Sequence, residues 1–160
     1  TGGRQLPNEG GNIYDHFHVA YEFPNNVMAH LGCRQIKGCY NENADYIRGT
    51  KGALIIGKGD KPYIDGEARW RFRGEEKNMY QVEHDELFAA IRKGEMLNDG
   101  TWMMHSTMLG IMGRMAAYNG KKITWQEAIS SDEDLAPEAT LTWGDKFEPT
   151  PMPRPGLLKA

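Results

Sequence analysis

Apolar and polar side chains alternate along residues 13–23, the clearest pattern in the first third of the chain. On an extended strand this spacing places Phe17, Val19 and Tyr21 on one face, and His16 and His18 on the other. The Pro-Asn-Asn sequence at residues 24–26 predicts a tight turn, because proline presets its backbone angle and asparagine tolerates a left-handed one. Residues 27–36 are therefore expected to return as the second strand of a hairpin.

Further short strands are predicted at residues 44–48, 53–56 and 68–72, separated by glycine-rich turns. After Gly74 the apolar spacing becomes helical, which predicts one helix over residues 79–92 and a second over residues 99–118. Gly94 and Asn119-Gly120 supply stop signals for these helices. The wide apolar stripe of the second helix predicts packing on two sides, and Gly110 and Gly113 indicate close backbone contacts.

Thr124 and Glu127 have the spacing of a capping box, which predicts a short helix ending near Ser130. From residue 132 onward the chain is rich in proline and is expected to form an extended tail packed on the domain. Four apolar residues of this tail are expected to be buried: Leu135, Leu141, Trp143 and Phe147. The predicted fold is α+β, an open-faced, mostly antiparallel sheet with helices on one face, comprising residues 1–131 and followed by the tail at residues 132–160.

The composition of the chain indicates a folded domain and gives no sign of nucleic-acid binding or a membrane span. The chain has 160 residues, 39% of them hydrophobic, and a net charge of −3, which is typical of a folded domain and shows no basic footprint for nucleic acid. No apolar run approaches the length that spans a membrane. Cys33 and Cys39 lack the spacing of zinc ligands and are expected to be buried free thiols.

Dinucleotide-binding and common catalytic motifs are absent. Gly57-Lys58-Gly59 is only a fragment of a G-x-G-x-x-G turn and leads into Pro62 instead of a helix. No P-loop, G-x-S-x-G or H-E-x-x-H sequence occurs. The sequence therefore assigns no catalytic residue, no metal ligand and no cofactor-binding residue, and this chain alone is not expected to bind NAD or NADP.

Polar candidates cluster around the predicted hairpin. His16 and His18 share a strand face with Tyr14, which is compatible with a metal site, a polar strand surface or contact with a sugar substrate. Arg34 and Gln35 are followed by Asn41, and their planar guanidinium and amide groups suit sugar hydroxyls. Pairing with carboxylates such as Asp45 explains the same residues equally well, so both interpretations stay open.

Three stretches carry a resemblance to a known family: GNIYDHFHVAYEFPNNV, CRQIKGCYNENADYIRGTKG and STMLGIMGRMAAYNGKKITWQEAISS. Together with LTWGD and PMPRPG in the tail, they resemble, in order, the C-terminal domain of bacterial Gfo/Idh/MocA oxidoreductases. The resemblance implies an upstream Rossmann domain that binds NAD or NADP, and a C-terminal domain that completes the substrate site and builds oligomers. It implies hydride transfer at a sugar or cyclitol carbon, and some relatives use this redox step to cleave glycosides.

The family's glycine turn and catalytic histidine are expected upstream of Thr1, so only substrate-side roles are assigned here. The expected substrate-binding residues are Tyr14, His16, Arg34, Gln35 and Asn41. An uncovered sheet face carrying Trp70, Phe72 or Tyr46 is expected to form a homo-oligomer. The alternatives are a stand-alone carbohydrate-binding or assembly module, or part of an NAD-assisted glycoside hydrolase, and the compartment stays open.

Overall fold

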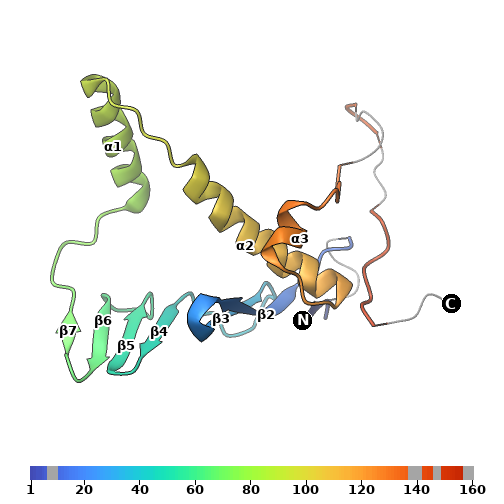
Figure 1. The fold of residues 1–160 in the computed structure, drawn as a ribbon, viewed down its shortest axis with the longest axis horizontal. Coiled ribbons are helices and arrows are strands. Elements are labelled where there is room, and N and C mark those ends of the chain that lie inside the picture. The colour runs from blue at the N-terminus through green and yellow to red at the C-terminus, as the bar shows by residue number, and fades with distance from the viewer. Residues whose placement is uncertain (7–10, 137–141, 146–148, 157–160) are drawn as a thin grey trace. The chain divides into compact units, whose positions relative to one another are not determined.

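The computed structural model describes residues 1–6, 11–136, 142–145 and 149–156. These residues form an α+β fold with antiparallel sheets, as the sequence predicts (Figure 1). The chain divides into two compact units, one of residues 1–37 with 99–160 and the other of residues 38–98. The strands accordingly form two sheets, one in each unit, where the sequence predicted one. No helix of the described residues is long and apolar enough to cross a membrane.

The first unit is built on a three-stranded antiparallel sheet in the order β1-β2-β3. Asn25 and Asn26 of the turn have φ angles of 60° and 58°, a left-handed conformation that asparagine tolerates. The predicted hairpin is thus confirmed, although its second strand ends two residues early. The elements are β1 (Gly2–Gly3), β2 (His16–Phe23), the 3-10 turn η1 (Pro24–Asn26) and β3 (Val27–Arg34).

Two helices complete the first unit, α2 (Gly100–Asn119) and α3 (Trp125–Ile129). α2 packs against β1 and β2, and it ends at Gly120, whose φ of 70° forms a left-handed cap. The predicted capping box of α3 is present in full: the Thr124 side chain accepts from the Glu127 N–H, and the Glu127 carboxylate accepts from the Thr124 N–H.

The packing of the N-terminal half of α2 differs from the prediction that this helix is covered on two sides. Its Trp102 and Met103 side chains are 76% and 64% exposed, so this half is not packed on two sides. Gly113 is buried against Val19 and Tyr21, as a close backbone contact requires, whereas Gly110 has no atom within 4 Å of its absent Cβ. The prediction was therefore right for Gly113 and wrong for Gly110, because α2 meets the sheet only along its C-terminal half.

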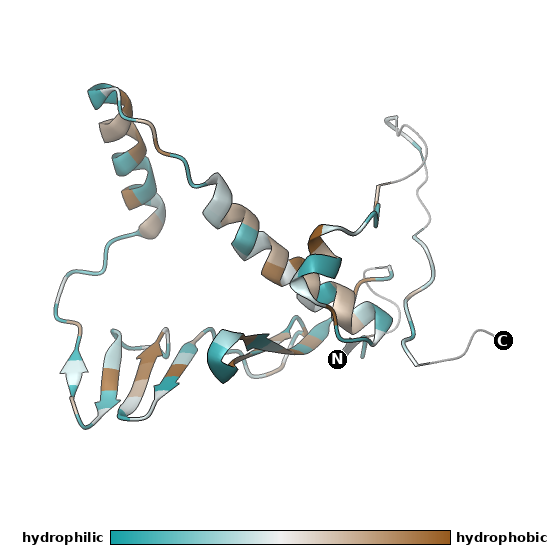
Figure 2. Cartoon of the chain, viewed as in Figure 1, coloured by the Kyte–Doolittle hydropathy of each residue, from teal (hydrophilic) through white to brown (hydrophobic). Residues whose placement is uncertain are grey.

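The second unit contains a four-stranded antiparallel sheet in the order β4-β5-β6-β7, followed by α1. Figure 2 shows β5 as the most continuously hydrophobic of these strands. α1 is capped by Asn78, whose side chain accepts from the Tyr80 N–H at 3.0 Å, and ends at Gly94 as predicted. The elements are β4 (Asp45–Gly49), β5 (Gly52–Ile56), β6 (Tyr63–Gly66), β7 (Trp70–Arg71) and α1 (Met79–Lys93).

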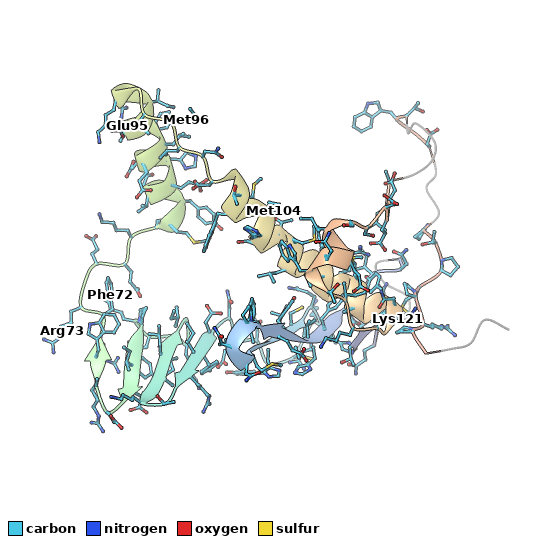
Figure 3. All side chains as sticks on the ribbon, in the orientation of Figure 1. Phe72, Arg73, Glu95, Met96, Met104 and Lys121 are labelled. Atoms are coloured by element: carbon cyan, nitrogen blue, oxygen red, sulfur yellow. The ribbon has the colours of Figure 1, made fainter. Side chains whose placement is uncertain are left out.

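One face of the four-stranded sheet is apolar across all four strands. Ile47, Leu54, Ile64 and Trp70 are successive cross-strand partners and form a transverse row, called here the isoleucine row. Ile47 is 59% exposed and Trp70 is 49% exposed. Phe72 lies beyond β7 with its ring 6.4 Å from that of Trp70 (Figure 3). Tyr46 pairs with Ile55 on the opposite face, so it does not share a surface with Trp70.

Residues of the tail contact the N-terminal part of the first unit through two hydrogen bonds. The Tyr14 hydroxyl donates to the Pro153 carbonyl at 2.8 Å, and the Asn12 side chain donates to Thr150 at 2.8 Å. Leu135 and Trp143 are exposed, so the expectation that they are buried was wrong: within the described part of the chain, no apolar layer covers either side chain. Leu141 and Phe147 lie outside the described residues.

Both cysteines are exposed, which corrects the expectation of buried thiols. Cys33 belongs to β3, where every residue is exposed because α2 packs against the other two strands of its sheet. Cys39 lies just past Gly38, at the start of the second unit. The small, apolar character of cysteine predicts burial only where another layer covers the strand.

Candidate functional site

Asp15, immediately before β2, organises the polar residues at this end of the first sheet. Its Oδ2 accepts hydrogen bonds from the backbone N–H groups of Gln5 and Leu6 at 2.8 and 2.9 Å. Its Oδ1 lies 2.7 Å from Nδ1 of His16. The Asp15 side chain is only 9% exposed, so this carboxylate is a fixed acceptor rather than a solvated surface charge.

The contact with Asp15 orients the His16 ring. A carboxylate only accepts, so Nδ1 of His16 carries a proton and donates; with the ring in its neutral form, Nε2 is then the acceptor. The His16 side chain is 44% exposed, which leaves the ring accessible. Gly3 lies beside it, and a Cβ at this position would be 3.4 Å from Nε2, so glycine leaves room around that atom.

The pKa of Asp15 reflects two opposing influences. Burial raises the pKa, and hydrogen bonds from Leu6, His16 and Gln5 lower it by more, so the net pKa lies below the ordinary value for aspartate. A carboxyl group with a depressed folded-state pKa stabilises the fold above its unfolded-state pKa, near 4, and loses that contribution as the pH falls through the folded value.

Replacing Asp15 by asparagine is therefore expected to change how stability depends on acid. Wild-type protein should lose stability below about pH 4 as Asp15 becomes protonated, and Asp15→Asn should lose less over the same range. Thermal unfolding of both proteins from neutral to acidic pH measures this difference. Asp132→Asn, at an exposed carboxylate of the same unit, is the matched control. Parallel curves for wild type and Asp15→Asn would contradict the assignment.

Arg34 and Gln35 lie beside the Asp15–His16 pair. His16 and Arg34 are direct cross-strand partners at the open end of the hairpin, and the Gln35 N–H donates to the Asp15 carbonyl at 2.8 Å. Three of the five predicted substrate residues are thus brought together at one corner of the first sheet. Gln35 makes this contact through its backbone, so the side chains that share the strand face at the corner are the oriented imidazole of His16 and the guanidinium of Arg34.

The other two predicted residues lie elsewhere. Tyr14 is 5% exposed, its ring centroid is 4.4 Å from that of Tyr118, and its hydroxyl is bonded to Pro153. Burial and the neighbouring Tyr118 raise the pKa of Tyr14. Tyr14 therefore packs beneath the corner rather than opening onto it. Asn41 is exposed and belongs to the second unit.

His18 lies on the same strand face as His16, and its ring stacks on that of His30, with centroids 6.1 Å apart. Stacked rings do not direct their nitrogens toward one point, as ligands of a common ion must. Among the described residues, no three histidine, cysteine, aspartate or glutamate side chains are grouped so that they hold a metal ion.

Two residues of the corner were not identified from the sequence. Strict alternation puts Asp15 on the same strand face as Phe17, and an acid at this otherwise apolar position was the available signal. Arg4 had no signal: its Nε donates to the Leu6 carbonyl at 2.6 Å, and its Nη1 donates to the Ile13 carbonyl at 3.0 Å. Arg4 thereby anchors the segment whose N–H groups bind Asp15.

Comparison with protein-family models, curated proteins and solved structures gives no match for this chain. Function is therefore inferred from the residues and their geometry.

Proposed function

We propose that this chain is the substrate-side and oligomerisation part of an NAD(P)-dependent oxidoreductase that acts on a sugar, glycoside or cyclitol hydroxyl. A Rossmann domain outside these 160 residues would bind NAD or NADP and supply hydride transfer. The observation that carries the proposal is His16, oriented by Asp15 and placed opposite Arg34 at an open strand end. The ordered motifs that resemble the Gfo/Idh/MocA C-terminal domain support the same interpretation.

The corner suits a polyol because a sugar hydroxyl both donates and accepts. Nε2 of neutral His16 accepts from a hydroxyl, and the Arg34 guanidinium donates to a hydroxyl or ring oxygen through a planar fork. Asp15 directs its acceptor oxygens to the protein rather than to the substrate, since they accept from Gln5, Leu6 and His16. Its role is to hold the imidazole in one tautomer and one orientation, so that substrate binding requires little reordering of the ring.

The test of the proposal is substitution in the full-length enzyme, at His16 and at Arg34. His16→Ala and Arg34→Ala are each expected to raise KM or lower kcat so that kcat/KM falls by about tenfold or more, the cost of one lost hydrogen bond to a charged or oriented partner. Cofactor affinity should stay unchanged, because these residues lie on the substrate side. Steady-state kinetics with the sugar, and calorimetry with NAD, measure the two effects.

His30→Ala is the matched control for these variants, because His30 lies on the same sheet face without contacting Asp15 or Arg34 in the strand register. If sugar-dependent rates are unchanged in both site variants, the residues are scaffold and the substrate site lies elsewhere. The 160-residue chain alone should show no NAD binding by calorimetry. Micromolar affinity would contradict the assignment of the cofactor to another domain.

We further propose that the isoleucine row forms the contact between two copies of the chain, because four apolar side chains in line form an uncovered patch. Ile47→Glu places a charge in this row and is expected to shift an oligomer toward monomer. Arg48→Glu, the next residue on β4, points to the opposite face and should leave the oligomer intact. Light scattering over a range of concentrations measures both, and an oligomer unaffected by Ile47→Glu would exclude this surface.

A further inference from the structure

β1 covers only the first part of one edge of β2. Gly2 and Gly3 pair with Phe17 and His16, and the last bonds along this edge join Thr1 and His18. The His18 N–H donates to the Thr1 carbonyl at 2.8 Å, and the Thr1 amino group donates to the His18 carbonyl at 2.8 Å. Beyond His18, no strand of the described chain pairs with this edge (Figure 1).

The uncovered part of the edge presents backbone donors and acceptors. In an antiparallel sheet the N–H and C=O of alternate residues point to the same edge. Because those of His18 point toward β1, the corresponding groups of Ala20 and Glu22 point the same way. Both residues are exposed. An open edge of this kind is a template for another extended segment.

An apolar groove of about 870 Å³ runs along the same edge. Its walls come from β2, from the C-terminal half of α2 and from the segment that joins α2 to α3, all within the first unit. Figure 3 marks Lys121, which also lines the groove, just past the end of α2. The apolar side chains that line it include Val19, Leu109, Met112, Ala116, Ile123 and Trp125.

We propose that the residues immediately preceding Thr1 in the longer polypeptide form a strand that continues β1 along β2 and fills this groove. The inference rests on the proposed function, which supplies an upstream domain. The Thr1 nitrogen already lies at His18, so a chain continuing from it meets the edge in register. The residue before Thr1 then pairs with Val19, and the third residue before Thr1 pairs with Tyr21.

This register predicts the pattern of the incoming strand. Side chains opposite Val19 and Tyr21 point to the face that α2 covers, because Tyr21 bonds to Leu109 of α2 and Val19 lies beside Gly113. They are therefore apolar and occupy the groove. The side chain opposite Ala20 points to the histidine-bearing face and is polar. The ion pair between Lys122 and Glu22 lies at the far end of the groove and limits the length of the strand.

An extended backbone fits this site better than a small ligand does, because strand addition satisfies the row of main-chain groups while alternate side chains fill the apolar space. The strand also has a consequence for the proposed function. It would tie the upstream domain to β2, the strand that begins with His16, and so hold cofactor and substrate corner in a fixed relation.

Amide hydrogen exchange tests the inference directly. In the full-length protein, the amides of Ala20 and Glu22 are expected to exchange at least about tenfold more slowly than in the 160-residue chain, because they become bonded to the added strand. The amides of β3 should be unchanged and serve as the internal control. Equal exchange of Ala20 and Glu22 in both proteins would overturn the inference, even if the full-length enzyme is active.

A second experiment, on a fusion of the 160-residue chain, tests the added strand without the upstream domain. A short strand of alternating valine and serine is fused before Thr1, and a matched version carries proline at the position opposite Ala20, where the backbone N–H is needed. Only the first should slow exchange at Ala20, and Ala116→Trp, which fills the groove, should abolish the effect. No protection in the fusion overturns the inference. If the fusion is protected while the natural gene encodes no dinucleotide-binding domain upstream of Thr1, that combination overturns the proposed function and leaves the inference standing.

Varying the protein concentration distinguishes a strand of the same polypeptide from a second copy of the chain. If the 160-residue chain without any extension protects Ala20 and Glu22 as its concentration rises, then a second copy occupies the edge. That outcome would also overturn the inference, since the strand would come from another molecule.

Discussion

Tyr14→Ala is expected to lower the free energy of unfolding of the first unit by about 3–5 kcal/mol, the range for removing a buried aromatic ring. The Tyr14 side chain is among the most buried of the molecule, at 5% exposure. Its ring centroid lies 5.7 Å from that of Phe17 and 4.4 Å from that of Tyr118. Truncation therefore removes one ring of a cluster in which Tyr14, Phe17 and Tyr118 all contact one another, and it leaves a cavity.

The hydroxyl of Tyr14 makes a smaller, separate contribution. It donates to the Pro153 carbonyl at 2.8 Å and so attaches the tail to the unit. Tyr14→Phe retains the ring and should cost only about 1 kcal/mol, the net value of one hydrogen bond. Urea unfolding followed by circular dichroism measures both variants. Ile13→Ala, at a side chain that is 63% exposed, is the control and should change stability by less than about 0.5 kcal/mol.

The two Tyr14 variants also distinguish packing from substrate binding. If Tyr14 contacts the sugar, Tyr14→Phe should impair turnover in the full-length enzyme while stability changes little. If it only supports the corner, turnover should follow stability. A Tyr14→Ala variant that unfolds within about 1 kcal/mol of wild type would contradict the packing role, since no cavity cost would then be present.

The sequence predicted best those elements whose conformation depends only on residues adjacent in the chain. The turn at residues 24–26 fixes the register of the hairpin, because Phe23 and Val27 flank it and every later pair follows, out to His16 opposite Arg34. The capping box at Thr124 and the left-handed Gly94 likewise depend only on neighbouring residues. The part of the candidate site that rests on the hairpin was therefore predictable.

Features that depend on tertiary pairing were not predictable. β6 (Tyr63–Gly66) was missed because Asp65-Gly66 has the composition of a turn, whereas in the structure Gly66 pairs with Gly52. A Cβ on Gly66 would lie 2.3 Å from the Lys51 carbonyl oxygen, so glycine permits an approach of two backbones, a property that the sequence does not distinguish from turn formation. The role of Asp15 was missed for a related reason, since its partners come from the distant Gln5 and Leu6.

Gly113→Leu is expected to lower the free energy of unfolding by about 1–3 kcal/mol, because it forces a side chain into a filled contact between α2 and β2. A Cβ at Gly113 would lie 2.6 Å from the Tyr21 hydroxyl oxygen and 3.4 Å from Cγ2 of Val19. Gly110 lies one turn earlier on the same helix, where it is exposed and where an added Cβ would have no atom within 4 Å; this is the site of the matched variant Gly110→Leu. It should instead raise stability by about 0.5–1 kcal/mol, since leucine favours the helix more than glycine does.

Tyr21 provides the decisive control for this contact. Its hydroxyl donates to the Leu109 carbonyl at 2.9 Å, which holds the oxygen over Gly113. In wild type, Gly113→Ala gains about 1 kcal/mol of helix propensity and loses a comparable amount to the clash, so its net effect is small. In a Tyr21→Phe background the obstructing oxygen is absent, and the same substitution should stabilise the protein by about 1 kcal/mol. Equal effects of Gly113→Ala in both backgrounds, measured by urea unfolding, would show that α2 and β2 do not meet at this point.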